Sequence, residues 1–241
     1  MKIRVLGDGY FKLDKSYLVY TKYMGTIYKA CFNVLYVEAG GERILVDTGI
    51  GELPEKYRKF YPVERKPEEA LEARLKSIGV EPGKITLVIN THLHFDHCGN
   101  NKLFRNATFL VQVDELRYAY YPDRFMKGGY IREQFDIPGI SIEPLYGYRE
   151  VVEGVEVIPT PGHTPGHQSV VLTRDDGVQV VFCGDAAPLS ENLERENIPG
   201  IVYSPVSALE SIKLLKQLRA DVYIYPHEPI PPDKLKLIEQ G

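Results

Sequence analysis

Three of the six histidines in this 241-residue chain lie close together, in the segment THLHFDH at residues 91–97. Side chains two residues apart at the end of an extended strand point in the same direction, so His92 and His94 are placed to bind one metal ion. Asp96 and His97 follow beyond a turn, where they can face a second ion. Imidazole nitrogens and carboxylate oxygens at this density suit a borderline cation such as Zn²⁺. The segment therefore predicts a metal site rather than a set of solvated loop histidines.

Three more ligand-type residues occur singly further along the chain. His163 lies in TPGHTPGH at residues 160–167, where the prolines and glycines predict a rigid turn that presents a side chain. Asp185 follows the apolar run at 178–183, and His227 follows the sequence VYIYP. In isolation each has an ordinary alternative as a packing or turn residue. Because each of them follows a predicted apolar strand, one edge of the sheets could gather them all.

Short β-rich runs predict the strands that position these side chains. The Gly-Gly pair at 40–41 and the Asp-Gly pair at 176–177 predict hairpin turns. Helices are expected over residues 67–79, from about Asp114, and from Ser204 onward. Two strand-rich halves, each followed by helices, predict one domain over residues 1–241 with a sheet-on-sheet core and helices outside. The expected strands span residues 3–6, 32–38, 43–46, 85–89, 108–111, 140–145, 151–158, 168–173, 178–182 and 222–225.

Composition excludes several classes of function. The net charge is −4, with 29 basic and 33 acidic residues, so the chain offers no electrostatic footprint for nucleic acid or an anionic membrane. No apolar run approaches the roughly 18 residues needed to span a bilayer. Asp8 interrupts the first apolar residues before they could form the hydrophobic core of a signal peptide, so we expect a cytoplasmic protein. Three widely spaced cysteines predict no disulfide framework.

Taken together, these motifs resemble the metallo-β-lactamase superfamily of binuclear metallohydrolases. The resemblance rests on THLHFDH, TPGHTPGH, CGDA at 183–186, the late PHE at 226–228 and LVDTG at 45–49, and so covers nearly the whole chain. HLHFDHCGNN, GHTPGHQS and SALESIKLLKQL are most similar to the N-acyl homoserine lactonase branch. The implied fold is a four-layer αβ/βα sandwich of the α/β class.

The resemblance also implies a set of metal ligands and their supports. Asp47 would hold the ligand loop, the segment that carries His92 to His97. His167 would lie outside the ligand set, in a structural or supporting role, and Cys98 and Cys183 match no ligand position. The implied cofactors are two divalent ions per chain, Zn²⁺ foremost, with Fe, Mn or Co as alternatives. The first ion would be bound by His92, His94 and His163, and the second by Asp96, His97 and His227, with Asp185 bridging the two.

The chemistry implied is hydrolysis of a lactone or a related cyclic ester. Two cations roughly 3.5–4 Å apart can share a hydroxide that attacks the substrate carbonyl, and Asp96 or Asp185 would carry the proton. One departure concerns the substrate: the lactonase branch has a Tyr three residues after the bridging Asp, where this chain has Pro188. A Tyr from the aromatic stretch 118–130 is one candidate to replace it, although that stretch could equally form a dimer interface or core.

Other members of the superfamily supply alternative functions. A glyoxalase II-like thioester hydrolase would use the same seven ligands, but no basic cluster lies near His227 to bind a glutathione carboxylate. An RNase Z-like phosphodiesterase fits the acidic balance less well, and a flavodiiron oxidoreductase would need a second cofactor domain. A non-catalytic member would be expected to lack at least one ligand. We therefore expect a small-molecule ester or lactone substrate and no nucleic-acid or membrane partner, with a homodimer as a candidate assembly.

Overall fold

The computed structural model describes residues 1–240. The strands are β1 (Lys2–Asp14), β2 (Ile27–Ala39), β3 (Glu42–Val46), β4 (Val63–Glu64), β5 (Leu87–Ile89), β6 (Thr108–Gln112), β7 (Ser141–Leu145), β8 (Arg149–Val152), β9 (Val155–Pro159), β10 (Gln168–Thr173), β11 (Gln179–Phe182) and β12 (Val222–Ile224). The α-helices are α1 (Glu55–Arg58), α2 (Leu71–Ser77), α3 (Val113–Tyr120), α4 (Ser190–Arg195), α5 (Pro205–Gln217) and α6 (Pro232–Glu239).

The first sheet, within residues 1–240, contains seven strands in the order β4-β1-β2-β3-β5-β6-β7. β1, β2 and β3 are antiparallel neighbours, and β2 turns into β3 through Gly40 and Gly41, whose φ angles of 58° and 81° favour glycine. β3, β5, β6 and β7 run parallel. Because parallel strands end at the same edge, Asp47 after β3 lies beside the segment that follows β5.

The second sheet, over the same described residues, contains five strands in the order β12-β11-β10-β9-β8. β11 and β12 are parallel, with Phe182 opposite Ile224, so Asp185 and His227 emerge at the same edge. β9 and β10 form an antiparallel pair whose connection carries His163. The two sheets meet at this edge, where the Gln168 N–H donates to the Thr91 carbonyl at 2.9 Å.

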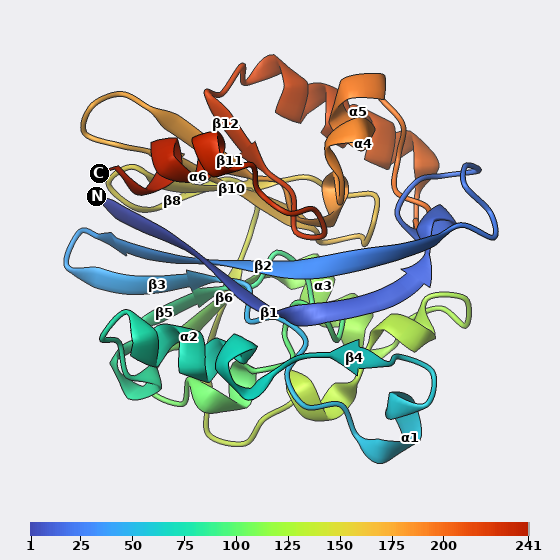
Figure 1. Ribbon diagram of the computed structural model, residues 1–241, viewed down its shortest axis with the longest axis horizontal. Helices are drawn as coiled ribbons and strands as arrows, with labels where there is room; N and C mark the ends of the chain where they lie inside the picture. The colour runs from blue at the N-terminus through green and yellow to red at the C-terminus, as the bar shows by residue number, and fades with distance from the viewer. Residues whose placement is uncertain (241) are drawn as a thin grey trace.

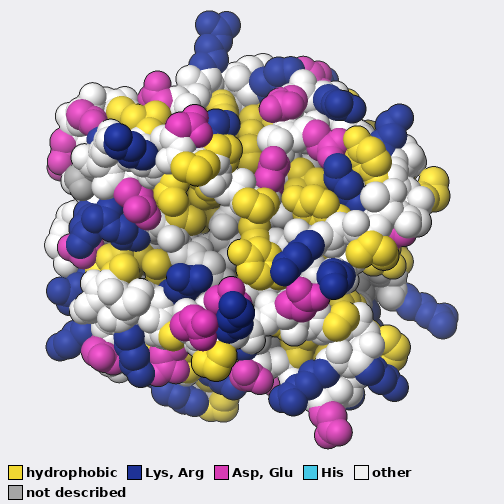
Figure 2. All heavy atoms as spheres, in the orientation of Figure 1, with side chains coloured by type: hydrophobic (Ala, Val, Ile, Leu, Met, Phe, Trp, Pro, Cys, Tyr) yellow, Lys and Arg dark blue, Asp and Glu magenta, His cyan; other side chains and the backbone are white. Residues whose placement is uncertain are grey.

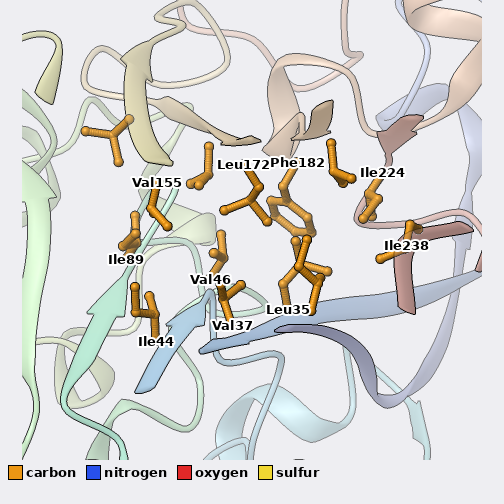
Figure 3. Close-up of a cluster of buried hydrophobic side chains, with 14 of the residues drawn as sticks. Leu35, Val37, Ile44, Val46, Ile89, Val155, Leu172, Phe182, Ile224 and Ile238 are labelled. Carbon is orange, nitrogen blue, oxygen red and sulfur yellow. The ribbon is translucent and has the colours of Figure 1, made fainter. Parts of the chain in front are cut away.

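The main hydrophobic core lies between the two sheets (Figure 3). Leu35 and Val46 from the first sheet and Leu172 and Phe182 from the second are all fully buried there. On the outer faces, α2 packs against the first sheet and α5 against the second, as Figure 1 shows. Apolar helical spacing explains both contacts, since one face of α5 buries Ala208, Ile212 and Leu215. The prediction of a four-layer αβ/βα sandwich is confirmed.

Several predicted elements differ from the observed ones. The strand predicted at 3–6 is the start of the longer β1, which continues past a bulge between Gly7 and Tyr10. The predicted helix over 67–79 is split, because the extended backbone of Ala70 (φ −64°, ψ 141°) separates a 3-10 turn from α2. The single strand predicted over 151–158 is a hairpin of β8 and β9, turning at Gly154 with φ 77°.

The surface carries charges of both signs. On the face in Figure 2, Lys and Arg side chains alternate with Asp and Glu side chains, and apolar side chains lie between them. No α-helix within residues 1–240 combines the length and apolar character that crossing a membrane requires. All six histidines are buried, so none of them belongs to the exposed surface.

Candidate metal centre

The histidine-rich segment forms a loop at the carboxyl end of β5 instead of extending the strand. Beyond the end of β5 at Ile89, the Asn90 N–H still donates to the Leu110 carbonyl of β6 at 3.2 Å, but the Thr91 N–H leaves the sheet and donates to Asp47 Oδ1 at 2.7 Å. The strand geometry expected for His92 and His94 is therefore wrong, although their ring centroids lie only 4.6 Å apart. The turn of the loop brings the two histidine rings together, as the alternation of an extended strand was expected to do.

All seven predicted ligand residues meet at this edge of the sandwich. Asp185 lies centrally: its Oδ2 is 3.4 Å from His163 Nε2, and its Oδ1 is 3.4 Å from His97 Nε2 and 3.1 Å from His227 Nε2. Three overlapping groups could each hold a cation, with ligand atoms within 4.8 Å of one another: His92, His94 and His163; His92, His97 and Asp185; and Asp96, His97 and His227.

Hydrogen bonds on the far side of three rings fix the orientation of these rings. His163 Nδ1 lies 2.7 Å from the Ile201 carbonyl oxygen, and His227 Nδ1 lies 3.0 Å from the Cys31 carbonyl oxygen. His97 Nδ1 lies 2.7 Å from Asp47 Oδ2. Each Nδ1–H donates to its oxygen, so Nε2 is the nitrogen that faces the centre of the site.

Three unpaired atoms test whether these residues fit metal ions. His92 Nε2, His97 Nε2 and Asp185 Oδ1 are buried and have no hydrogen-bond partner among residues 1–240. A buried polar atom without a partner costs about 1–3 kcal/mol, so a site with several of them is built for something else to satisfy them. A divalent cation does this for imidazole nitrogens and a carboxylate oxygen together. The residues fit such ions.

The charges of the site agree with that fit. Burial, together with the nearby His97, His94 and His163, lowers the pKa of His92 well below its usual value, so this imidazole is neutral, as metal ligation requires. Burial alone would raise the pKa of Asp185, but His227, His97 and His163 lower it well below its usual range. Asp185 is therefore ionised. Burial also lowers the pKa of His94 and His163. Burial alone would lower the pKa of His97 and of His227 too, but nearby carboxylates, Asp185 foremost, raise it, so a bound cation would displace a proton from each of these rings.

Asp47 supports the ligand loop from β3. Its Oδ1 accepts the Thr91 N–H, and its Oδ2 accepts the Thr91 hydroxyl at 2.9 Å and the His97 ring N–H at 2.7 Å. Asp47 has φ 61°, a left-handed backbone that is uncommon outside glycine and strained. Its three accepted hydrogen bonds hold that conformation and tie the loop to the first sheet.

A cavity of about 540 Å³ opens above the ligand-type residues. Its floor includes His94, Asp96, His163, Asp185 and His227. Its walls are mostly apolar, and several of their side chains are well exposed at the opening, among them Phe60 at 66% and Phe125 at 68%. The walls include Phe11, Leu13, Leu18, Ile27, Phe60, Phe95, Phe125, Met126 and Ile201.

Most of the chain matches a known protein family. Residues 33–227 match the family described as the metallo-beta-lactamase superfamily. The chain belongs to the metallo-beta-lactamase superfamily. The matched range runs from within β2 to His227, so it includes every strand end from which a superfamily ligand residue is expected.

Within the superfamily, the chain is similar to individual N-acyl homoserine lactonases. The chain is 35% identical over 163 residues to the N-acyl homoserine lactonase AttM of Rhizobium radiobacter, and 38% identical over 144 residues to an N-acyl homoserine lactonase of Bacillus thuringiensis. These matches span 65% and 60% of this chain but only 62% and 55% of the relatives, less than two thirds of their length. A solved N-acyl homoserine lactone hydrolase, with N-hexanoyl-L-homoserine at its catalytic metal centre, superposes with a TM-score of 0.83 at 29% identity, covering 94% of this chain and 92% of that chain.

His167 lies beside the centre but in none of the three ligand groups. Its Nδ1 is 2.8 Å from Thr160 Oγ1, and its ring packs 5.2 Å from that of His92. Burial lowers the pKa of His167 to about 3, so it is a neutral side chain. A structural or supporting role for His167 stays a prediction, and its packing against His92 is the contact that supports it.

One buried carboxylate was missed by the sequence reasoning. Glu115 lies in the first turn of α3 and is fully buried, where it accepts hydrogen bonds from the loops that carry His92 to His97 and His163. Acidic residues in a first helical turn are common and usually solvated, so the sequence carried no signal. Only the packing of the two loops against α3 identifies it.

The aromatic stretch 118–130 contributes to the cavity but supplies no phenol to it. The hydroxyl groups of Tyr118, Tyr120 and Tyr130 contact Asp123, Asp136 and Glu115, respectively. None of these tyrosines lines the cavity, whereas Phe125 and Met126 do. The tyrosines that line it are Tyr17 and Tyr61, from other parts of the chain. These two residues are therefore the candidates to replace the Tyr that the lactonase branch has at the position of Pro188.

Proposed function

We propose that this chain hydrolyses lactones, with N-acyl homoserine lactones or related cyclic esters as substrates, using two bound divalent ions. The observation that carries the proposal is the carboxylate of Asp185 between two histidine groups at the floor of an apolar-walled cavity. Support comes from the likeness to N-acyl homoserine lactonases in sequence and structure. An apolar cavity with a few convergent polar groups suits a small acylated substrate.

We assign His92, His94 and His163 to one ion, and Asp96, His97 and His227 to the other, with Asp185 between them. The distances from the two oxygens of Asp185 to His163 and to His97 and His227 support this division. Imidazole nitrogens and an ionised carboxylate suit zinc, which we propose as the metal. Such ions, when bound, polarise an ester carbonyl and lower the pKa of water to near 7.

The side chains of the cavity position the substrate for this reaction. The apolar walls hold an acyl group and exclude water from the floor, while Asp96, whose side chain is only 12% exposed, lies at the floor and can accept or return a proton at its carboxylate. Asp185, which is ionised between the two histidine groups, can also accept a proton. These two aspartates are the residues to which we assign proton transfer.

Tyr61 is positioned to take the place of the missing phenol. Its ring packs 4.5 Å from that of Phe95, on the ligand loop, and it lines the cavity together with Asp96. Burial, with a contribution from Asp96, raises the pKa of Tyr61, so its hydroxyl stays protonated and can donate to the substrate carbonyl oxygen. At position 188 the proline contributes only a backbone carbonyl, which accepts the His227 N–H at 3.2 Å.

The proposal is tested by loading the purified chain with zinc, counting metal ions per chain, and assaying lactones and thioesters with a pH indicator. We expect about two ions per chain and turnover of N-acyl homoserine lactones. Fewer than one ion per chain under metal-replete conditions would contradict the binuclear assignment. Full occupancy with turnover of thioesters alone would instead identify a thioester hydrolase.

A further inference from the structure

Glu115 joins two ligand-bearing loops that come from different sheets. Its Oε1 accepts the backbone N–H of Leu93 at 2.9 Å, and Leu93 lies between His92 and His94. Its Oε2 accepts the hydroxyl of Thr164 at 2.6 Å, next to His163. The N–H of Gly166 also donates to this carboxylate. One side chain thus fixes the spacing between the loop after β5 and the loop between β9 and β10.

The loop from the second sheet approaches Glu115 too closely for any side chain. A Cβ added at Gly166 would lie 2.0 Å from the Glu115 nitrogen. Glycine at this position therefore lets the loop rest on the first turn of α3, where the carboxylate can reach its donors. The contact is part of how the two loops are brought together, not an accident of a long side chain.

The same carboxylate also acts on the ring of His94. The Nδ1 of this ring lies 3.0 Å from His163 Nε2 at the centre of the site, but its buried Nε2, on the far side, has no partner within residues 1–240. Packing holds it instead, with the Tyr130 ring 4.6 Å away in an edge-to-face arrangement. The Tyr130 hydroxyl in turn donates to Glu115 Oε1 at 3.0 Å.

We propose that Glu115 is a positioning residue for the metal pocket formed by His92, His94 and His163. It acts through Leu93, Thr164 and Tyr130, and so sets the affinity of this pocket for its metal ion. The inference rests on the proposed metal-binding function but not on the identity of the substrate. A carboxylate is required because it accepts from donors on both loops at once, whereas an amide has one acceptor oxygen and turns its NH₂ group toward the remaining donors.

The direct test is Glu115→Gln, read out by zinc binding to the full-length chain. The zinc-loaded protein is titrated with a competing chromogenic chelator, which resolves the affinities of the two ions. We expect one ion to bind roughly 10–100-fold more weakly, the range seen when a partner of a metal ligand is lost, while the other changes little. Arg174→Gln is the matched control, because Arg174 is a buried polar residue just past the opposite end of β10, bonded to the Leu237 carbonyl.

Two milder variants keep the test decisive if Glu115→Gln folds poorly. Thr164→Val removes one hydroxyl donor, and Tyr130→Phe removes another while keeping the ring beside His94. We expect each to weaken the same zinc ion severalfold, with little change in the thermal unfolding of the metal-free chain. Unchanged zinc affinities in all three variants, even with lowered thermal stability, would show that Glu115 is only structural. Wild-type protein that binds two zinc ions but cleaves no lactone would contradict the proposed substrate and leave this inference standing.

Discussion

A methyl group added at Gly129 should displace His94 and weaken metal binding. The Cβ of an alanine at this position would lie 2.5 Å from His94 Cδ2 and 2.6 Å from its Nε2, whereas an ordinary contact begins at 3.4 Å. The ring must therefore move by about 0.9 Å, the difference between 3.4 and 2.5 Å, or the 3-10 turn at Lys127–Gly129 must move instead. Metal–ligand distances tolerate only about 0.2 Å. We therefore expect Gly129→Ala to lower zinc affinity roughly 10–100-fold, as for other disturbed ligand supports.

The neighbouring glycine provides the control for this experiment. A Cβ at Gly128 would meet only the Tyr61 hydroxyl, at an ordinary 3.8 Å. Gly129 lacks the positive φ that would strain any side chain, so an effect of Gly129→Ala reflects the contact with His94. Zinc affinity is measured by chelator competition and kcat/KM by lactone hydrolysis. If both alanine variants match the wild type in both measurements, then the turn moves instead of His94, and the expected displacement of the ligand is refuted.

Three further predictions concern the centre and the cavity. Asp185→Ala should lose at least one zinc ion and lower kcat roughly 100-fold or more. Asp221→Ala should do neither, because its carboxylate is bonded to the Gln179 N–H at the start of β11, away from the centre. Full activity in Asp185→Ala would disprove the bridging assignment. Tyr61→Phe should lower kcat roughly 100-fold at unchanged zinc affinity, and Tyr17→Phe should have little effect; equal kinetics in both would remove Tyr61 from the reaction. Zinc at about 100 times its Kd should stabilise the chain by about 2.7 kcal/mol, raising Tm by about 5–10 °C in differential scanning calorimetry; an unchanged Tm would contradict specific binding to the folded state.

The layers of the fold followed from local apolar patterns, but the element boundaries did not. Alternating and continuous apolar runs predicted most of the strands, and helical spacing predicted the inner face of α5. β1 extends far beyond its predicted end because its long pairing with β2 supplies backbone hydrogen bonds that no local propensity reveals. The hairpin of β8 and β9 was read as one strand because both its arms are rich in valine and glutamate, and Gly154 alone marks the turn.

The sequence by itself determined which chemistry was available. Histidine and aspartate at short spacings, each following an apolar strand, predicted a metal site and the superfamily to which the chain belongs. Tertiary structure decided how those groups are held: His227 is oriented by the carbonyl of Cys31, 196 residues away, and His163 by that of Ile201. It also buried Glu115 between two loops and brought Tyr61 to the cavity. Such contacts leave no local pattern, because any residue can offer a backbone carbonyl and only the folded chain determines which one lies behind the ring.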